Sequence, residues 1–390
     1  PRLPPMDKQR RRLTVSHTDG PPLLDDDSSP TGGGLAKDAR DQLIEDWGVA
    51  DLFNWAEQGN LRAIALLTMT DRVGKDKGSK EDKDEFWVSQ PPNEQWLQDA
   101  LGVGWACRKG CKPEACNQDC LSILAVEDMF EFLGVYDGHG PYGHDVSEFV
   151  CRELPKKFLK CLGKNVLSGE GDIEAALKES FLGIQAQIKE RMRDRAESSG
   201  TTVTIAYHSV GKNKVWLAHV GDSRAVLGNA DGSKAKALTV DHKPDLEGER
   251  RRIEQAGGRV IFDGYFNHRV FAARTLAPGL NMSRALGDIM GHEEAGLSAE
   301  PEVLELDLAR DLAQFGLGGG PGGDVRLVLC TDGVWEFIED SEAFKIMARG
   351  GKATPNECIR DLTDCGWRKW MEDSDNEIAD DITGILIPLR

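Results

Sequence analysis

The residues best suited to chemistry in this sequence are aspartates at the ends of short apolar runs. Taken singly, an aspartate at the end of a strand is usually a turn former. Four such sites in one chain suggest more, because strand ends of one sheet can gather side chains at one point. Gathered carboxylates repel one another unless they are protonated or neutralised by cations. The four sites are Asp119, Asp137, Asp332 and the pair Asp380-Asp381.

A carboxylate cluster with few histidines favours hard cations. The chain has 66 acidic residues and 8 histidines, and oxygen ligands suit Mg²⁺ or Mn²⁺ better than Zn²⁺. Two such ions about 4 Å apart are the usual machinery for hydrolysing a phosphate ester. The aspartates therefore predict a two-metal hydrolase.

The number and spacing of the cysteines disfavour both a disulfide framework and a structural zinc site. Nine cysteines is an odd number, and their spacing is not that of a disulfide framework, so we expect reduced thiols. Four of them, Cys107, Cys111, Cys116 and Cys120, lie close together but lack the CxxC spacing of structural zinc sites. We interpret them as free thiols.

Charge and hydropathy restrict the partners. The formal net charge is −18, which disfavours binding to a polyphosphate backbone. No run approaches the ~18 apolar residues of a membrane span, and the opening residues do not resemble a signal peptide. We expect a monomer in the cytoplasm, with the nucleus as an alternative because of the basic run Lys8–Arg12. Any leader removed before Pro1 would not be visible.

Composition divides the chain into three parts. Residues 1–34 are rich in Pro, Asp, Ser and Gly and are expected to be disordered. Residues 35–103 form a helical and charged extension of unknown role, with a helical pattern from Ala36 to about Met69. Residues 104–390 mix short apolar strands with amphipathic helices and are expected to form the catalytic domain.

Within residues 104–390 the pattern predicts antiparallel pairs of strands. Two hairpins turn at Val210–Asn213 and at Asp231-Gly232. A long helix over 172–196 begins at the N-cap Asp172, and two further helices lie near 341–348 and 355–371. Hairpins and separate helices without a βαβ rhythm indicate an α+β fold with antiparallel sheets.

An ordered series of motifs resembles the PPM-type protein phosphatases, also called protein phosphatase 2C. The series covers about residues 104–390. It comprises VYDGHG (135–140), SGTTVTIA (199–206), VGDSRAVL (220–227), DHKPDLEGERRRIEQAGGRV (241–260), MSRALGD (282–288), PEV (301–303), CTDGVWEF (330–337) and DDITGILI (380–387). The resemblance implies a four-layer α/β/β/α sandwich with two central antiparallel sheets. It also implies a signalling hydrolase that removes phosphate from serine and threonine of phosphorylated proteins by Mg²⁺- or Mn²⁺-activated water.

The resemblance also implies roles for individual residues. Asp137 resembles a ligand that bridges two central metal ions, and His139 the general acid that protonates the leaving alkoxide. The other implied metal ligands are the Gly138 carbonyl, Asp332 and Asp380, with Asp119 holding a metal-bound water. Asp222 and Glu336 would flank a third, weaker metal ion.

Two departures from the family pattern keep alternatives open. Gln118 stands where the family often has glutamate, so one direct carboxylate ligand becomes an amide. Glu114 stands where family members often hold the substrate phosphate with arginine, which leaves Arg108, Lys109 and Lys112 as candidate cations, with Arg108 and Lys112 preferred. The rival interpretations are a catalytically weak pseudophosphatase that binds phosphopeptides or regulates a partner, and a two-metal phosphodiesterase.

One surface is a candidate for substrate contact. In the family a flap lies beside the active site, and the matching segment Phe262–Leu276 is rich in aromatic and basic residues. The alternative is that its aromatic side chains pack in the core.

Overall fold

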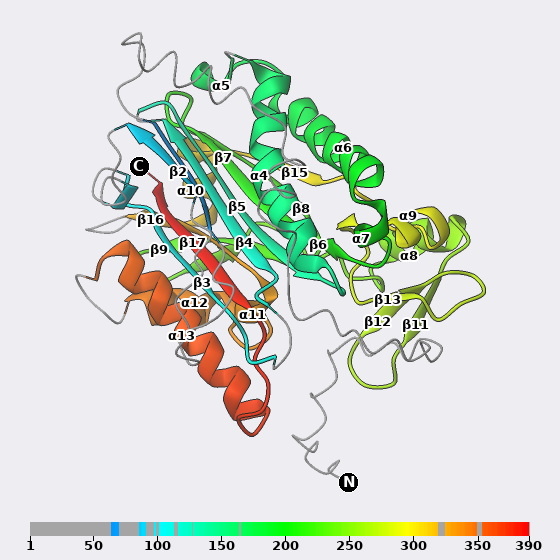
Figure 1. The fold of residues 1–390 in the computed structure, drawn as a ribbon. Coiled ribbons are helices and arrows are strands. Elements are labelled where there is room, and N and C mark those ends of the chain that lie inside the picture. The colour runs from blue at the N-terminus through cyan, green and yellow to red at the C-terminus, as the bar shows by residue number, and fades with distance from the viewer. Residues whose placement is uncertain are drawn as a thin grey trace.

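The computed structural model describes residues 64–69, 86–90, 97–98, 101–112, 116–126, 128–163, 165–318, 324–348 and 353–389. Their fold is built on two antiparallel sheets that pack face to face and are covered by helices on both outer faces (Figure 1).

The larger sheet contains the longest strands of the fold. Its strands follow the order β15 (Glu302–Asp307), β8 (Lys214–Val220), β7 (Val203–Ser209), β5 (Phe130–His139), β4 (Asp119–Val126), β1 (Ile64–Met69) and β2 (Phe86–Gln90). Two short strands, β6 (Gly200–Thr201) and β14 (Leu286–Gly287), extend from the end of β5. All these pairings are antiparallel, as the hairpin signals predict.

The smaller sheet is assembled from segments far apart in the sequence. Its strands follow the order β10 (Ala235–Ala237), β9 (Arg224–Asn229), β16 (Val325–Cys330), β17 (Ile382–Leu389) and β3 (Gly104–Arg108). Both predicted hairpins form: β7 pairs with β8, and β9 with β10.

Three cores separate four layers. Along β4, Cys120, Leu124 and Val126 face the helices α4 (Gly143–Leu162) and α6 (Ile173–Arg191), whereas Leu121 and Ile123 face the smaller sheet. This alternation is the period of two that a strand buried on both faces requires. The smaller sheet in turn packs its outer face on α11 (Asp332–Trp335), α12 (Asp340–Ala348) and α13 (Pro355–Asp373). The predicted α+β fold with antiparallel sheets is confirmed.

Helix ends follow the sequence signals. Asp172 caps α6, accepting a hydrogen bond from the Ala175 N–H at 2.9 Å. Helix α13 begins with a capping box between Thr354 and Glu357. The remaining helices are α5 (Asn165–Ser168), α7 (Arg193–Ala196), α8 (Glu247–Gln255), α9 (Ile289–Glu294) and α10 (Leu308–Phe315). Among the described residues, no helix combines the length and hydropathy needed to cross a bilayer.

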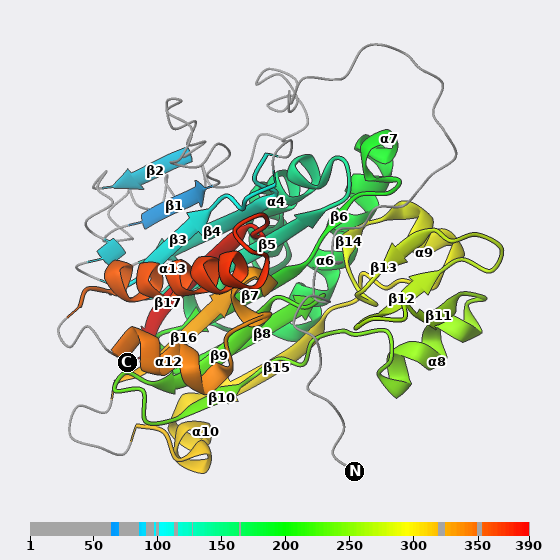
Figure 2. The same ribbon diagram turned by 90° about the horizontal axis from the view of Figure 1, so that it is seen from below.

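A small three-stranded sheet projects from one end of the sandwich (Figure 2). It consists of β11 (Arg259–Phe262), β12 (His268–Phe271) and β13 (Pro278–Leu280), with α8 packed against it. This is the segment expected to form a flap. Phe262, Tyr265 and Phe266 are exposed there, so the alternative that these aromatics fill the core is wrong.

The N-terminal extension differs from its prediction. The helical pattern expected up to Met69 is wrong over Ile64–Met69, which forms strand β1 between β2 and β4. An apolar run of this length has no periodicity that separates a buried strand from a helix, and hydrogen bonding to the edge of β4 decides for the strand. The larger sheet therefore begins before residue 104. The predictions for residues 1–34 and for the basic run Lys8–Arg12 lie outside the described residues.

Candidate active site

The two sheets bring the predicted aspartates to one shared edge. Asp119 begins β4 and Asp137 stands near the end of β5, and the antiparallel register places them directly opposite each other. Residues that face each other across such a pair project to the same side of the sheet, and like charges in that position destabilise it. The strand pairing thus imposes a close approach of two acidic side chains.

The smaller sheet supplies its acidic residues at the same edge. Asp332 follows β16, Asp380 and Asp381 precede β17, and Asp222 lies in the turn from β8 to β9. Asp119 is tied to this sheet directly, because the Thr331 hydroxyl donates a hydrogen bond to its Oδ2 at 2.9 Å. Asp332 and Asp137 are also hydrogen bonded to each other through their side chains.

Burial and mutual repulsion disturb the ionisation of this cluster. Burial, followed by the charges of Asp119, Asp332, Asp380 and Asp222, raises the pKa of Asp137 well above its usual range. The pKa of Asp119 is raised in the same way, and burial with Asp222 and Asp380 raises the pKa of Asp332 to about 8. Carboxylates packed this densely favour neutralising cations. The buried Oδ1 of Asp222, which has no hydrogen-bond partner among the described residues, fits a cation as well.

Two lysines are paired with the cluster. Lys112 donates a hydrogen bond to Asp380, and Lys243 donates one to Asp222. Burial alone would lower the pKa of each lysine, but the neighbouring carboxylates outweigh burial and raise it. Both ammonium groups therefore remain charged.

Gln118 has a structural task in this arrangement. Its side-chain amide donates a hydrogen bond to the Gly140 carbonyl at 2.8 Å, and its main-chain carbonyl accepts one from Gly138. A Cβ atom on Gly138 would lie 2.6 Å from that carbonyl and 2.5 Å from the Gly143 carbonyl, so only glycine fits. Gln118 thus holds the turn at Gly140, which directly follows Asp137, Gly138 and His139 at the end of β5.

His139 is oriented by a residue that the sequence interpretation did not single out. Its Nε2 lies 2.6 Å from Oδ2 of Asp288, at the N-terminus of α9. Gly200 permits this approach, because a Cβ there would lie 2.1 Å from the same oxygen. Burial lowers the pKa of His139, but the charge and hydrogen bond of Asp288, with the charges of Asp222 and Asp332, together raise it. The Nδ1 atom is buried without a hydrogen-bond partner among the described residues.

Comparison with known proteins identifies the family of this chain. The family model for protein phosphatase 2C matches residues 107–375. The chain belongs to the protein phosphatase 2C family.

Named relatives support the assignment, and a solved structure shares the fold. Probable protein phosphatase 2C 34 of Arabidopsis thaliana is 35% identical over 294 residues, which are 70% of this chain and 76% of the relative. Protein phosphatase 2C homolog 2 of Aspergillus flavus is 34% identical over 65% of this chain and 50% of its own length. The serine-threonine phosphatase 2C of Toxoplasma gondii shares the fold, with a TM-score of 0.60 and 21% identity over 74% of this chain and 94% of that one.

The two cations predicted to hold the substrate phosphate are separated by the fold. Lys112 contacts the carboxylate cluster, but Arg108 pairs with Asp364 at 2.6 Å and lies 3.9 Å from the centre of the Trp367 ring. The alternation of β3 explains this, because Cys107 faces the space between the sheets and Arg108 faces α13. Lys109 donates to the main chain at Gly110 and Lys112, while Glu114 lies outside the described residues.

Glu336 occupies a more exposed position than the aspartates. It lies one helical turn after Asp332, and its N–H donates to the Asp332 carbonyl at 2.8 Å. Asp222 is buried by contrast. A phosphatase 2C metal site between them would be open to water on the Glu336 side.

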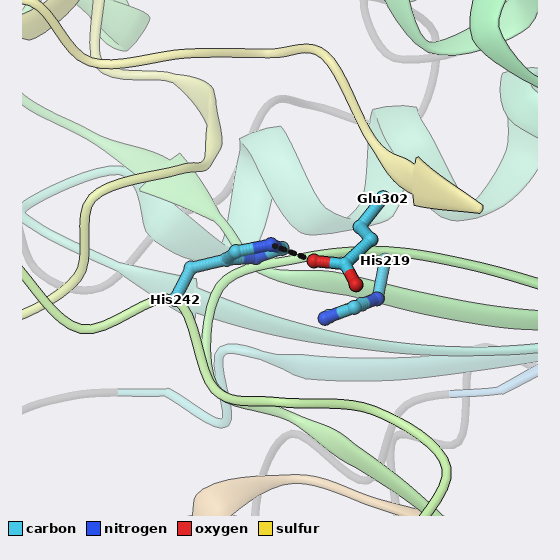
Figure 3. Close-up of side chains that lie close together, drawn as sticks. All are labelled: His219, His242 and Glu302. Carbon is cyan, nitrogen blue, oxygen red and sulfur yellow. Dashed lines mark ion pairs between the residues drawn. The ribbon is translucent and has the colours of Figure 1, made fainter. Parts of the chain in front are cut away.

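Two histidines and a glutamate, His219, His242 and Glu302, lie close together (Figure 3). His242 Nε2 is 3.5 Å from Glu302 Oε2, and the rings of His219 and His242 stack with centroids 4.3 Å apart. The Gly221 N–H donates to His242 Nδ1 at 3.2 Å. That bond places the proton of neutral His242 on Nε2, so no lone pair is left there for a metal ion. We assign this group a structural role in holding the turn.

The sequence motifs contained three side chains of this site to which the sequence interpretation gave no individual role. Asp288 ends the MSRALGD motif, and Lys243 lies inside the DHKPDL motif. Asp381 accepts hydrogen bonds from the Gly110 and Gln118 N–H groups at 2.6 and 2.8 Å. Motif membership was the available signal, but only the fold shows which atom each side chain contacts.

Proposed function

We propose that this phosphatase 2C member is catalytically competent and hydrolyses phosphoserine and phosphothreonine esters in proteins. The main observation in support is that several buried, mutually repelling aspartates lie together beside a histidine held by Asp288. Family membership supports the phosphatase activity, and the substrates would accordingly be phosphorylated proteins.

The carboxylates would hold Mg²⁺ or Mn²⁺, on which the family depends. Asp137, the Gly138 carbonyl, Asp332 and Asp380 would bind two central ions, with Asp119 supporting a coordinated water. Asp222 and Glu336, sharing Asp332, would bind a third, weaker ion. When bound, such ions activate water for attack and neutralise charge on the phosphoryl oxygens.

The chain's own residues supply the proton chemistry. Asp288 accepts a hydrogen bond from Nε2–H of His139, which leaves the proton on Nδ1 as the one available to a leaving group. The raised pKa of His139 favours the form that carries this proton. Lys112 is the better candidate for holding the substrate phosphate, because it contacts the cluster and Arg108 does not.

The pseudophosphatase alternative rests on Gln118. The contact of its amide with Gly140 favours competence instead, because the amide holds the turn that directly follows the catalytic residues at the end of β5. Turnover of p-nitrophenyl phosphate and of a phosphothreonine peptide with Mn²⁺, Mg²⁺ or EDTA tests the proposal. A phosphatase turns over both substrates with metal and neither with EDTA. Peptide binding without turnover would instead establish the pseudophosphatase.

For the whole protein we further propose a cytoplasmic monomer, with the nucleus as the alternative site. The net charge of −18 supports the absence of a nucleic-acid partner. The exposed flap aromatics Phe262, Tyr265 and Phe266 support a role in substrate contact.

A further inference from the structure

Three consecutive residues form hydrogen bonds with the turn that contains Asp222 or with Asp222 itself. Asp241 forms two hydrogen bonds with the Arg224 guanidinium, both at 3.0 Å. His242 exchanges main-chain and ring hydrogen bonds with Gly221. Lys243 then donates to Asp222 itself. The main chain on both sides of the Asp222–Lys243 pair is therefore fixed.

The anchoring of His242 extends beyond the turn. Its carbonyl accepts hydrogen bonds from the Ser283 N–H and hydroxyl at 2.8 and 3.0 Å, and its ring faces Glu302 (Figure 3). His219, on which the ring stacks, donates from Nε2 to the Val240 carbonyl at 3.0 Å. The main chain at Lys243 is thus held in place, and only the Lys243 side chain is free to move.

The Lys243 ammonium group lies against the Asp222 carboxylate, where a cation would neutralise its charge. Asp222 is buried, but one third of the Lys243 side chain remains exposed, so Lys243 has a path to water. The charge of Asp332, a second acid of the proposed third metal site, also acts on Lys243. A tethered charge has a high effective concentration at its partner, so a dissolved cation must displace it before binding.

We infer that Lys243 is an exchangeable internal counter-ion of Asp222, which competes with the third divalent metal ion. This rests on the proposed function, because it concerns the third site named there. The central ions, held mainly by Asp137 and Asp380, would not compete with Lys243. The inference adds a physical cost to binding at the third site, because a metal ion that enters it must first break the Asp222–Lys243 ion pair.

The test is direct binding of Mn²⁺, counted from the electron paramagnetic resonance signal of free Mn²⁺ in wild type and variants. Lys243→Met should tighten the weak class of sites by roughly two- to fivefold, the range that a partly exposed ion pair supports. Lys243→Arg should leave that class weak, because the charge is kept. Lys214→Met, which removes an ion pair with Glu305 on the far edge strand, is the matched control and should change neither class.

Two further variants separate the possible failures. If Asp222→Ala binds as many ions as wild type with the same affinities, the third site itself is wrong. If Asp222→Ala loses the weak class but Lys243→Met binds it no more tightly than wild type, the counter-ion role is wrong and the site survives. Lys243→Gln repeats the test with a side chain that can still hydrogen bond to Asp222, in case the methionine variant does not fold.

Thermal unfolding gives a second readout without turnover. In EDTA, Lys243→Met should melt below wild type, because Asp222 loses its partner. Saturating Mn²⁺ should close that gap. A gap that stays the same with and without Mn²⁺ would contradict the exchange.

Discussion

The Nε2 atom of His139 lies 2.6 Å from the Oδ2 atom of Asp288, 149 positions later in the chain. This contact orients the imidazole and affects its ionisation. Burial lowers the pKa of His139, but the charge and hydrogen bond of Asp288, with the charges of Asp222 and Asp332, together raise it. An acid that must be protonated to act stays active up to the pH at which it loses its proton. The pair therefore predicts a pH profile as well as a rate.

Asp288→Asn should move the alkaline limb of the profile of kcat to lower pH. Removing the negative charge disfavours the imidazolium, so the pKa of His139 falls and the active form is lost at a lower pH. The measurement is kcat for a phosphothreonine peptide at saturating Mn²⁺ across neutral and alkaline pH. A variant whose kcat falls equally at every pH would show that Asp288 only supports the fold.

His139→Ala should separate substrates by their leaving groups. General acid catalysis is typically worth ~10²–10⁴-fold, and an alkoxide needs a proton to leave whereas p-nitrophenolate does not. The variant should lose far more activity on phosphothreonine peptide than on p-nitrophenyl phosphate. Equal losses on both substrates would indicate that His139 positions the loop or the metal ions instead.

Gln118→Glu should lower the stability of the metal-free protein and raise its affinity for Mn²⁺. The substitution removes the donor to the Gly140 carbonyl and sets a carboxylate against it, which should lower the free energy of unfolding in EDTA by about 1–3 kcal/mol. The added charge should tighten Mn²⁺ binding. Denaturant unfolding and Mn²⁺ titration measure the two effects, and Gln118→Ala should show the loss of stability without the gain in affinity. An unchanged stability of the glutamate variant would exclude the turn-holding role.

Without metal, the stability of the protein should fall as pH rises through the neutral range. The pKa of Asp332 is raised to about 8, so between its ordinary value of about 3.9 and pH 8 the folded state keeps a proton that the unfolded state releases. The free energy of unfolding then falls with pH, by at most about 1.4 kcal/mol per unit for one proton.

The comparison with Asp332→Asn isolates this group. In EDTA, the difference in unfolding free energy between wild type and the variant should shift against wild type as pH rises from 6.5 to 8. Asp361→Asn, at an exposed position on α13, is the control and should leave the pH dependence unchanged. A wild-type curve parallel to that of Asp332→Asn would contradict the raised pKa.

The sequence predicted the elements of the catalytic fold because they carry strong local signals. The cap at Asp172 and the turn at Asp231-Gly232 act over a few residues, and both form. Strand β1 was not predicted, because its strand conformation depends on pairing with β4, far along the chain. Local pattern cannot report a partner that only the folded sheet provides.

The same distinction holds for the site. Aspartates at strand ends are visible as soon as the strands are, so Asp119 and Asp137 were found together with the sheet that places them opposite each other. The contacts of Asp288 with His139 and of Lys243 with Asp222 depend on how separate loops meet. Arg108 is the opposite case, because its residue type favoured a role that the fold does not support. Its guanidinium suits a phosphate, but the alternation of side chains along β3 directs it to Asp364.

The most direct test of the central claim is turnover by Asp137→Asn. Asp137 has the charges of four other aspartates around it, and the substitution removes the charge proposed to be shared by both central ions. Metal ions supply several kcal/mol of transition-state stabilisation, and each 1.36 kcal/mol is tenfold in rate. At saturating Mn²⁺, kcat for a phosphothreonine peptide should therefore fall by about a thousandfold or more while circular dichroism shows an intact fold. Near-normal turnover by the folded variant would contradict the proposed site.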